Sequence, residues 1–294
     1  MADDRLIPVL PGIGGLVEGY GGIILDLWGV IHDGRTPYPG AAETLARLRE
    51  AGKKVVMLSN APRRAAAVIE AMAEMGIARA LYTDVLSSGE LAWRALAARD
   101  DPWVAGLGRR CLHVGPERDA GLFDGLDLER IDAPEEGAFL LNTGPWRDEE
   151  TLADFEELLR RAAACAMPMV CANPDREVIR GGRRIICAGA LAERYRELGG
   201  AVRSYGKPHA AAYRACLDLM GIADTTRILA IGDSLETDIK GAAAAGIDAA
   251  LVTSGIHAEE LGLAYGEAPA PQAITTACRR LGLHPVAAVP AFLW

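Results

Sequence analysis

The chain has 294 residues, half of them hydrophobic, and a formal net charge of −9 at neutral pH. This length suffices for one large domain or two ordinary ones with a substantial core. The acidic balance provides no basic face of the kind that nucleic-acid binding needs. No apolar run is long enough to span a bilayer. We therefore expect neither a nucleic acid nor a membrane as a partner.

The cysteines and the start of the chain indicate a compartment. The six cysteines form no Cys-x-x-Cys pair, and most lie within apolar stretches. A free thiol in such a stretch behaves as a small hydrophobe, and reduced thiols are typical of a reducing compartment. The start, Met1–Arg5, is acidic, and no apolar signal region follows it. We therefore expect a cytoplasmic protein with reduced cysteines.

Strand-like and helix-like segments alternate along the first part of the chain. The apolar run that ends on Asp26 predicts a buried strand, and Gly52 and Gly76 each end a predicted helix. This alternation is typical of βαβ units around a parallel sheet. The predicted strands are Ile23–Asp26 and Lys54–Ser59, and the predicted helices are Ala41–Ala51 and Arg63–Met75.

The middle of the chain predicts a second, smaller α/β unit, after which the first pattern resumes. The middle segments are the strands Cys111–Val114, Ala138–Asn142, Met169–Ala172 and Arg184–Cys187 and the helix Asp148–Ala164. The later segments are the strands Ala201–Tyr205, Arg227–Ile231 and Ala249–Val252 and the helices Ala210–Met220 and Thr237–Ala245. We therefore predict a doubly wound α/β core, residues 1–87 and 203–294, interrupted by an inserted α/β domain, residues 88–202.

Four features at strand ends or in loops carry groups that could do chemistry: Asp26, Ser59-Asn60, Lys207, and the pair Asp233 and Asp238. Ligands of open α/β sheets bind beyond the carboxyl ends of the strands, so two acids placed there can meet in one site. Carboxylates suit a hard cation such as Mg²⁺. Each feature alone also has a structural explanation, as a helix cap, a turn former, a first-turn acid or a solvated lysine.

In their order along the chain, these features resemble the four motifs of the haloacid dehalogenase superfamily. Asp26 with Gly29 resembles the first motif, Ser59-Asn60 the second, Gly206-Lys207-Pro208 the third and Gly232–Ile239 the fourth. The resemblance implies a Rossmann-like core, and the insertion is similar to a C2-type cap. Further segments resemble the class IIA branch, which includes p-nitrophenyl, pyridoxal and sugar phosphatases: Pro39-Gly40-Ala41, Ala172-Asn173-Pro174-Asp175 and Gly189-Ala190.

The resemblance also implies an activity, a Mg²⁺-dependent hydrolysis of the phosphate monoester of a small metabolite. It makes Asp26 the nucleophile, which forms an aspartyl-phosphate, and makes Ser59 and Lys207 the other catalytic residues. Lys207 would pair with the phosphoryl group and keep close carboxylates ionised. The implied phosphate and substrate contacts are Ser59, Asn60, Lys207, Asn173 and Asp175, and the implied metal ligands are Asp26, Asp233, Asp238 and the backbone carbonyl of Trp28. Caps of this type often pair among relatives, which leaves a homodimer open.

Trp28 departs from the family pattern. Phosphatases of the family carry a second acid two residues after the nucleophile, which protonates the leaving oxygen and later activates water. Tryptophan cannot exchange a proton at neutral pH, and general acid–base catalysis typically supplies about 10²–10⁴-fold. Three hypotheses stay open: a weak phosphatase in which another group such as His32 supplies the proton, a metal- and metabolite-binding protein with little turnover, and a hydrolase whose leaving group needs no proton.

Other assignments are less favoured. Haloacid dehalogenases in the strict sense carry a tyrosine at the position of Trp28, but they need no metal, and this chain keeps both Asp233 and Asp238. Arg63 and Arg64 follow the second motif and either attract an anionic substrate or form a solvated helix face. The sequence does not identify the substrate or the oligomeric state.

Overall fold

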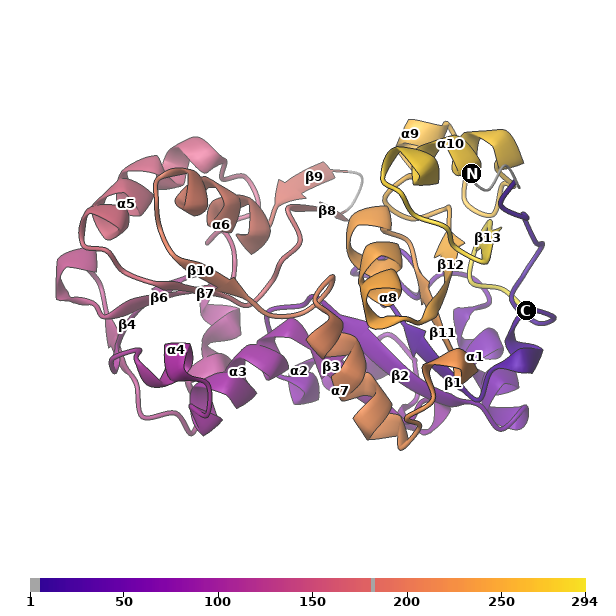
Figure 1. Ribbon diagram of the computed structural model, residues 1–294, viewed down its shortest axis with the longest axis horizontal. Helices are drawn as coiled ribbons and strands as arrows, with labels where there is room; N and C mark the ends of the chain where they lie inside the picture. Colours follow the sequence, from indigo (N-terminus) through magenta and orange to yellow (C-terminus); the bar gives the residue numbers. More distant parts are fainter. Residues whose placement is uncertain (1–5, 181–182) are drawn as a thin grey trace. The chain divides into compact units, whose positions relative to one another are not determined.

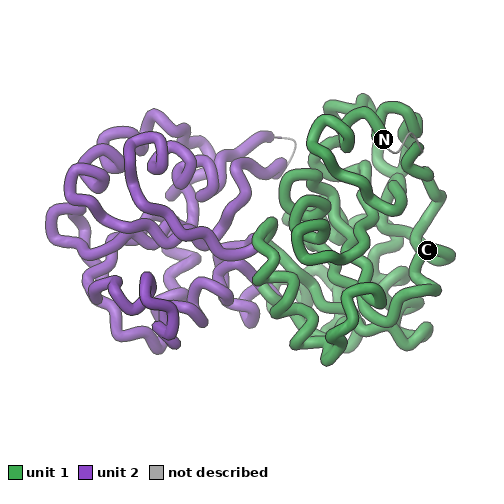
Figure 2. The backbone as a smooth tube through the Cα atoms, in the orientation of Figure 1, with its two compact units in different colours: residues 1–59, 69–86, 207–294 green, residues 60–68, 87–206 purple. Residues whose placement is uncertain are grey.

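The computed structural model describes residues 6–180 and 183–294, and the chain forms two compact units (Figure 2). The first unit contains residues up to 59, 69–86 and from 207 on, and the second contains residues 60–68 and 87–206. Compared with the domains predicted from the sequence, the segment 60–68 groups with the inserted unit, and that unit extends to Gly206. The acidic start, Met1–Arg5, lies outside the described residues.

The first unit is built on a six-stranded sheet (Figure 1). Its order is β13 (Ala287–Val289), β12 (Asp248–Val252), β11 (Ile228–Gly232), β1 (Gly22–Leu25), β2 (Lys54–Ser59) and β3 (Asp84–Ser87). β1 pairs in parallel with β2 and with β11. Taken in chain order, the strands are arranged as 3-2-1-4-5-6, so the order reverses between β1 and β11. This is the doubly wound Rossmann arrangement, and it confirms the predicted core.

The sequence explains the burial of this sheet. All four residues of β1 are buried, as expected of a strand that is covered on both faces. Helices α1 (Ala41–Glu50), α7 (Ala210–Met220) and α8 (Lys240–Ala245) contact strands of this sheet. α1 follows Gly40, which has a left-handed conformation, and ends before Gly52. The other helical segments of this unit are η1 (Val17–Gly19), η2 (Arg79–Leu81), η5 (Thr225–Arg227), η6 (Leu235–Ile239), α9 (Ala258–Leu261) and α10 (Pro271–Arg280). Helix α2 (Ala65–Glu74) begins in the second unit and ends in the first.

The second unit has its own five-stranded sheet, so its strands do not extend the first sheet. The order is β10 (Val202–Ser204), β7 (Met169–Cys171), β6 (Phe139–Asn142), β4 (Arg110–Val114) and β5 (Glu129–Ile131), and the pairs are parallel. The helical segments are α3 (Ser88–Ala98), α4 (Pro102–Ala105), η3 (Glu117–Phe123), η4 (Pro134–Glu136), α5 (Leu152–Ala164) and α6 (Ala188–Glu197). This confirms the inserted α/β unit.

Two buried clusters hold the second unit together, one on each face of its sheet. Phe155 of α5 and Tyr195 of α6 belong to one cluster, with Leu140 of β6. Leu96 of α3 belongs to the other, with Phe139 of β6. Figure 1 shows α5 and α6 on one side of this sheet and α3 and α4 on the other.

One predicted strand pairs outside the five-stranded sheet. The segment predicted as Arg184–Cys187 corresponds to β9 (Arg183–Ile186), which forms an antiparallel two-stranded sheet with β8 (Glu177–Arg180). In the described part of the chain, no helix is long and apolar enough to cross a membrane.

Candidate active site

The topology of the first unit places two acids at neighbouring strand ends. Asp26 follows β1 directly, and its backbone N–H donates to the carbonyl of Ile231 at 2.9 Å. Asp233 follows β11 directly. Because the strand order reverses between β1 and β11, both side chains lie at the topological switch point of the sheet. Open α/β sheets bind their ligands at this point.

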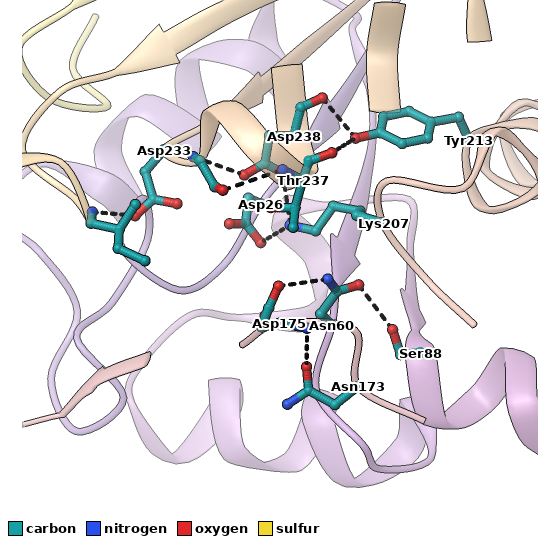
Figure 3. Close-up of polar contacts among 12 residues, drawn as sticks. Asp26, Asn60, Ser88, Asn173, Asp175, Lys207, Tyr213, Asp233, Thr237 and Asp238 are labelled. Carbon is teal, nitrogen blue, oxygen red and sulfur yellow. Dashed lines mark hydrogen bonds and ion pairs between the residues drawn. The ribbon is translucent and has the colours of Figure 1, made fainter. Parts of the chain in front are cut away.

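A third acid and a lysine complete the cluster (Figure 3). Carboxylate oxygens of Asp26, Asp233 and Asp238 all lie within 4.8 Å of one another. The Lys207 Nζ lies 2.6 Å from Asp26 Oδ1 and 2.7 Å from Asp238 Oδ1. All four side chains are buried, and Lys207 is only 3% exposed. The structure therefore brings together the four charged residues that the sequence places far apart.

The cluster carries more negative than positive charge. Burial raises the pKa of Asp238 to about 7, and the neighbouring Asp26 carboxylate adds to the shift. Burial and the same neighbour raise the pKa of Asp233 well above its usual value. Three carboxylates face one ammonium group, so the ionised site needs further positive charge to be stable.

Backbone groups and a tyrosine fix these acids in place. Asp233 Oδ2 accepts from the N–H of Ile256 at 2.7 Å. Asp238 Oδ2 accepts from the N–H of Ser234 at 3.1 Å. The hydroxyl of Tyr213 donates to the carbonyl of Asp238 at 2.9 Å (Figure 3). Asp238 itself lies in the π-helical turn η6, a form that occurs often at functional sites.

The donor set fits a divalent cation. Mg²⁺ prefers carboxylate oxygens and keeps several waters, and a buried group of like charges without enough counter-charge is stabilised by such an ion. The carboxylates of Asp26, Asp233 and Asp238 supply oxygen ligands at the right place. The participation of the Trp28 backbone carbonyl stays a prediction.

Of the other predicted substrate contacts, Ser59 lies in the first unit, and Asn60, Asn173 and Asp175 lie in the second. Ser59 ends β2, beside β1, and is 7% exposed. Asn60 belongs to the second unit, where its Nδ2 donates to Asp175 Oδ1 at 2.8 Å. Asn173 Oδ1 accepts from the N–H of Asp175 at 3.0 Å. Contact of any of these groups with a substrate stays a prediction.

Trp28 packs within the loop that follows the first strand. Its ring meets the ring of His32 edge-on, with centroids 5.6 Å apart. A Cβ added to Gly34 would lie 2.1 Å from Trp28 Cη2, so the indole lies directly on this glycine. His32 Nδ1 accepts from the N–H of Gly34 at 3.0 Å, which places the ring proton on Nε2. Burial lowers the pKa of His32 to about 4, so this ring is neutral at pH 7.

Arg63 and Arg64, which the sequence offered as possible contacts of an anionic substrate, form ion pairs within the protein. Arg63 forms an ion pair with Asp119, and Arg64 forms one with Glu90, which is 7% exposed. Both arginines therefore have carboxylate partners within the second unit. Sequence reasoning missed Tyr213, because an aromatic residue within an apolar helix resembles any other core residue.

A doubly wound α/β unit with three acids and one lysine at its switch point defines a class of proteins that bind a small ligand beyond the carboxyl ends of their strands. Comparison with known proteins identifies the family. Residues 23–129 match the model of the haloacid dehalogenase-like hydrolases, and residues 204–277 match a second model, described as HAD-hydrolase-like. A solved haloacid dehalogenase-like hydrolase from Brucella suis 1330 is 35% identical, with a TM-score of 0.81 over 96% of this chain and 99% of that one.

The chain belongs to the haloacid dehalogenase-like hydrolases, in their class IIA branch. The predicted superfamily and the prediction of a hydrolase are thereby confirmed. A D-glycerol 3-phosphate phosphatase of Mycobacterium tuberculosis is 30% identical over 80% of this chain. The chain spans 63% of that relative's length. A solved glycerol phosphate phosphatase from the same organism, in complex with magnesium, is 25% identical, with a TM-score of 0.62 over 82% of this chain and 70% of that one.

Proposed function

We propose that this protein is a Mg²⁺-dependent phosphate-monoester hydrolase that acts on a small phosphorylated metabolite. The observation that carries the proposal is the position of Lys207, which bridges Asp26 and Asp238 beside Asp233. A buried ammonium beside a carboxylate keeps that carboxylate ionised and therefore nucleophilic. Relatives named as glycerol phosphate and sugar phosphatases support a small phosphorylated substrate.

The reaction we propose has two steps. An oxygen of Asp26 bonds to phosphorus while the bond to the leaving oxygen breaks, so the phosphoryl group is transferred to the carboxylate. Water then attacks phosphorus, which releases inorganic phosphate and restores Asp26. Lys207 and Ser59 hold the phosphoryl oxygens. A Mg²⁺ ion held by Asp26, Asp233, Asp238 and the Trp28 carbonyl would neutralise charge on the transferred group.

Trp28 supports a restriction on the substrate. The indole N–H is a donor that does not ionise near neutral pH, so it cannot protonate a leaving alkoxide. We therefore propose that the first step is efficient only when the leaving oxygen is weakly basic. Trp28 also favours a second candidate function, a metal- and metabolite-binding protein with little turnover. In the second step, no carboxylate at position 28 would act as the base that activates the attacking water.

A substrate panel tests the proposal. We expect purified protein with Mg²⁺ to hydrolyse p-nitrophenyl phosphate and acetyl phosphate, and to lose this activity with a chelator. The matched control is Asp26→Asn, which removes the nucleophile and nearly preserves side-chain volume. Mg²⁺-dependent binding of phosphorylated compounds without release of phosphate would instead support the second candidate. Neither binding nor turnover across the panel would contradict both.

A further inference from the structure

A hydrogen-bonded chain surrounds the carboxamide of Asn60 within the second unit (Figure 3). Asn60 Nδ2 donates to Asp175 Oδ1 at 2.8 Å, and the hydroxyl of Ser88 donates to Asn60 Oδ1 at 2.9 Å. The Asp175 N–H donates in turn to Asn173 Oδ1. Asn60 is 3% exposed and Ser88 is fully buried. Three segments distant in sequence thus meet at one amide group.

The chemistry of these groups allows a single arrangement. An ionised carboxylate only accepts hydrogen bonds, so Asp175 must face the NH₂ side of the Asn60 carboxamide. The carbonyl oxygen of Asn60 then faces Ser88, whose hydroxyl can donate to it. Asp175 therefore determines which way the Asn60 carboxamide points, and the Ser88 hydroxyl holds it in that orientation as the donor to Asn60 Oδ1.

The backbone at Gly206 packs directly on this pair. A Cβ at position 206 would lie 1.8 Å from Ser88 Oγ and 2.4 Å from Asn60 Oδ1. Gly206 also has a φ of +110°, which L residues rarely adopt. This glycine immediately precedes Lys207, just as Asn60 immediately follows Ser59. The amide group is thus joined in sequence to two residues of the proposed active site.

We propose that Ser88 is a positioning residue that, through Asn60, anchors the loop Asn173–Asp175 before the substrate arrives. The inference rests on the proposed function, in which Ser59 binds the phosphoryl group. In this proposal Asp175 holds the loop in place by accepting from Asn60 and does not bind the phosphoryl group itself, because an ionised carboxylate cannot donate to a phosphoryl oxygen. An anchored loop and a fixed backbone beside Ser59 lower the ordering cost of binding.

Steady-state kinetics with p-nitrophenyl phosphate and Mg²⁺ test the role of Ser88. Ser88→Ala leaves the buried Asn60 oxygen without this donor, and we expect KM to rise by about tenfold with kcat little changed. The control Thr151→Ala removes an exposed hydroxyl from the same unit, which donates to Asp154 at the start of α5, and should leave KM as it is. An unchanged KM in Ser88→Ala would overturn the proposal.

Exchanging the side chains of Asn60 and Asp175 tests whether Asp175 anchors the loop through Asn60 or contacts the substrate directly. Asn60→Asp alone sets two carboxylates against each other and should raise KM most. Asp175→Asn alone keeps an acceptor for Asn60 Nδ2, so its KM should rise less than that of Asn60→Asp. The double variant Asn60→Asp/Asp175→Asn restores the hydrogen bond with donor and acceptor reversed, and should recover KM. A large effect of Asp175→Asn alone, without recovery in the double variant, would show that Asp175 contacts substrate directly.

Amide hydrogen exchange does not depend on turnover, so it tests the anchoring role of Ser88 separately from the proposed phosphatase activity. We expect amide hydrogen exchange of the segment 172–176 to be faster in Ser88→Ala and Asn60→Asp than in the wild type, and to return to wild-type protection in the double variant. If the wild-type protein hydrolyses no phosphate ester, the proposed function fails while this exchange pattern still decides the anchoring role. Exchange rates that are equal in all variants would contradict the anchoring role whatever the activity.

Discussion

Trp28 stands two residues beyond Asp26, where its indole is held between His32 and Gly34. If no acid protonates the leaving oxygen, the rate should fall steeply as that oxygen becomes more basic. We predict turnover of p-nitrophenyl phosphate and acetyl phosphate but very slow turnover of glycerol 3-phosphate. Trp28→Asp should raise the rate on the alkyl ester by up to about 10²–10⁴-fold if the new carboxylate reaches the leaving oxygen. Initial rates over leaving groups of graded pKa measure this dependence.

A direct look at the intermediate complements those rates. Because the second step would also lack a base, phosphate should persist on Asp26 long enough for detection by mass spectrometry after a rapid acid quench. Asp26→Asn provides the blank. Fast hydrolysis of glycerol 3-phosphate by the wild type would show that another group supplies the proton. His32 is a poor candidate at pH 7, because burial lowers its pKa to about 4.

Asp238 makes stability depend on pH in a defined direction. Its pKa is raised from 3.8 to about 7, so between these values the folded state binds more protons than the unfolded state. The contribution of Asp238 to the free energy of unfolding therefore falls as pH rises through this window. We predict that metal-free wild type loses stability relative to Asp238→Asn between pH 5 and pH 8, and that Mg²⁺ removes the loss.

Urea unfolding with a chelator or with Mg²⁺ measures both effects. The comparison with Asp238→Asn is needed because the buried His32 and His113 titrate in the opposite sense: burial lowers the pKa of each to about 4. A difference between the two proteins that does not vary with pH would contradict the prediction.

At the residue scale, the sequence predicted the acids and Lys207 because their spacing follows strand ends, which hydrophobic patterns reveal. It could not predict that Ser88 bonds Asn60, since that contact depends on how a helix start and a loop meet in space. It also left Arg63 and Arg64 open. Their carboxylate partners, Asp119 and Glu90, lie far enough along the chain that no local pattern connects them.

At the element scale, the close packing of β11 on η6 controls the position of Asp238. A Cβ at Gly232 would lie 2.1 Å from Asp238 Cγ, so an alanine there forces the carboxylate aside. We predict that Gly232→Ala lowers Mg²⁺ affinity by about tenfold or more, the scale seen when groups that orient metal ligands are lost. Isothermal titration with Mg²⁺ measures it.

The matched control for that titration is Gly15→Ala, because a Cβ at Gly15 meets nothing within 4 Å. Its Mg²⁺ affinity and thermal midpoint should equal those of the wild type. If Gly232→Ala binds Mg²⁺ as tightly as the wild type, Asp238 has no part in the metal site.

The strands that the sequence missed are short or begin with polar residues. β3 begins at Asp84, and β13 is only Ala287–Val289, so neither provides an apolar run of useful length. Ser87 caps α3, a helix that the sequence analysis did not assign, and its Oγ accepts from the N–H of Glu90. The Ser-x-x-Glu spacing of Ser87 and Glu90 is a helix-start signal that would have revealed this.

At the scale of the whole molecule, the thiols report on the integrity of both units. The six cysteines are free, and all but Cys165 are buried. Burial raises the pKa of Cys171 to about 11, and a thiol without thiolate character reacts slowly. We predict that iodoacetamide labels Cys165 alone in the native protein and all six thiols in denaturant, as counted by mass spectrometry. Labelling of Cys171 in the native state would show that its unit opens locally.

The separation of β1 from β11 along the chain has a consequence for the order of folding. Gly22 pairs with Ile228, so closing this contact brings together residues about 200 positions apart, at a high entropy cost. The second unit consists mostly of one continuous segment, 87–206, with its own buried clusters. Contacts that are nearer in sequence form sooner. In refolding, β4, β6 and β7 should therefore gain pulse-labelled amide protection before β1 and β11, so the proposed catalytic site would be the last part of the molecule to assemble.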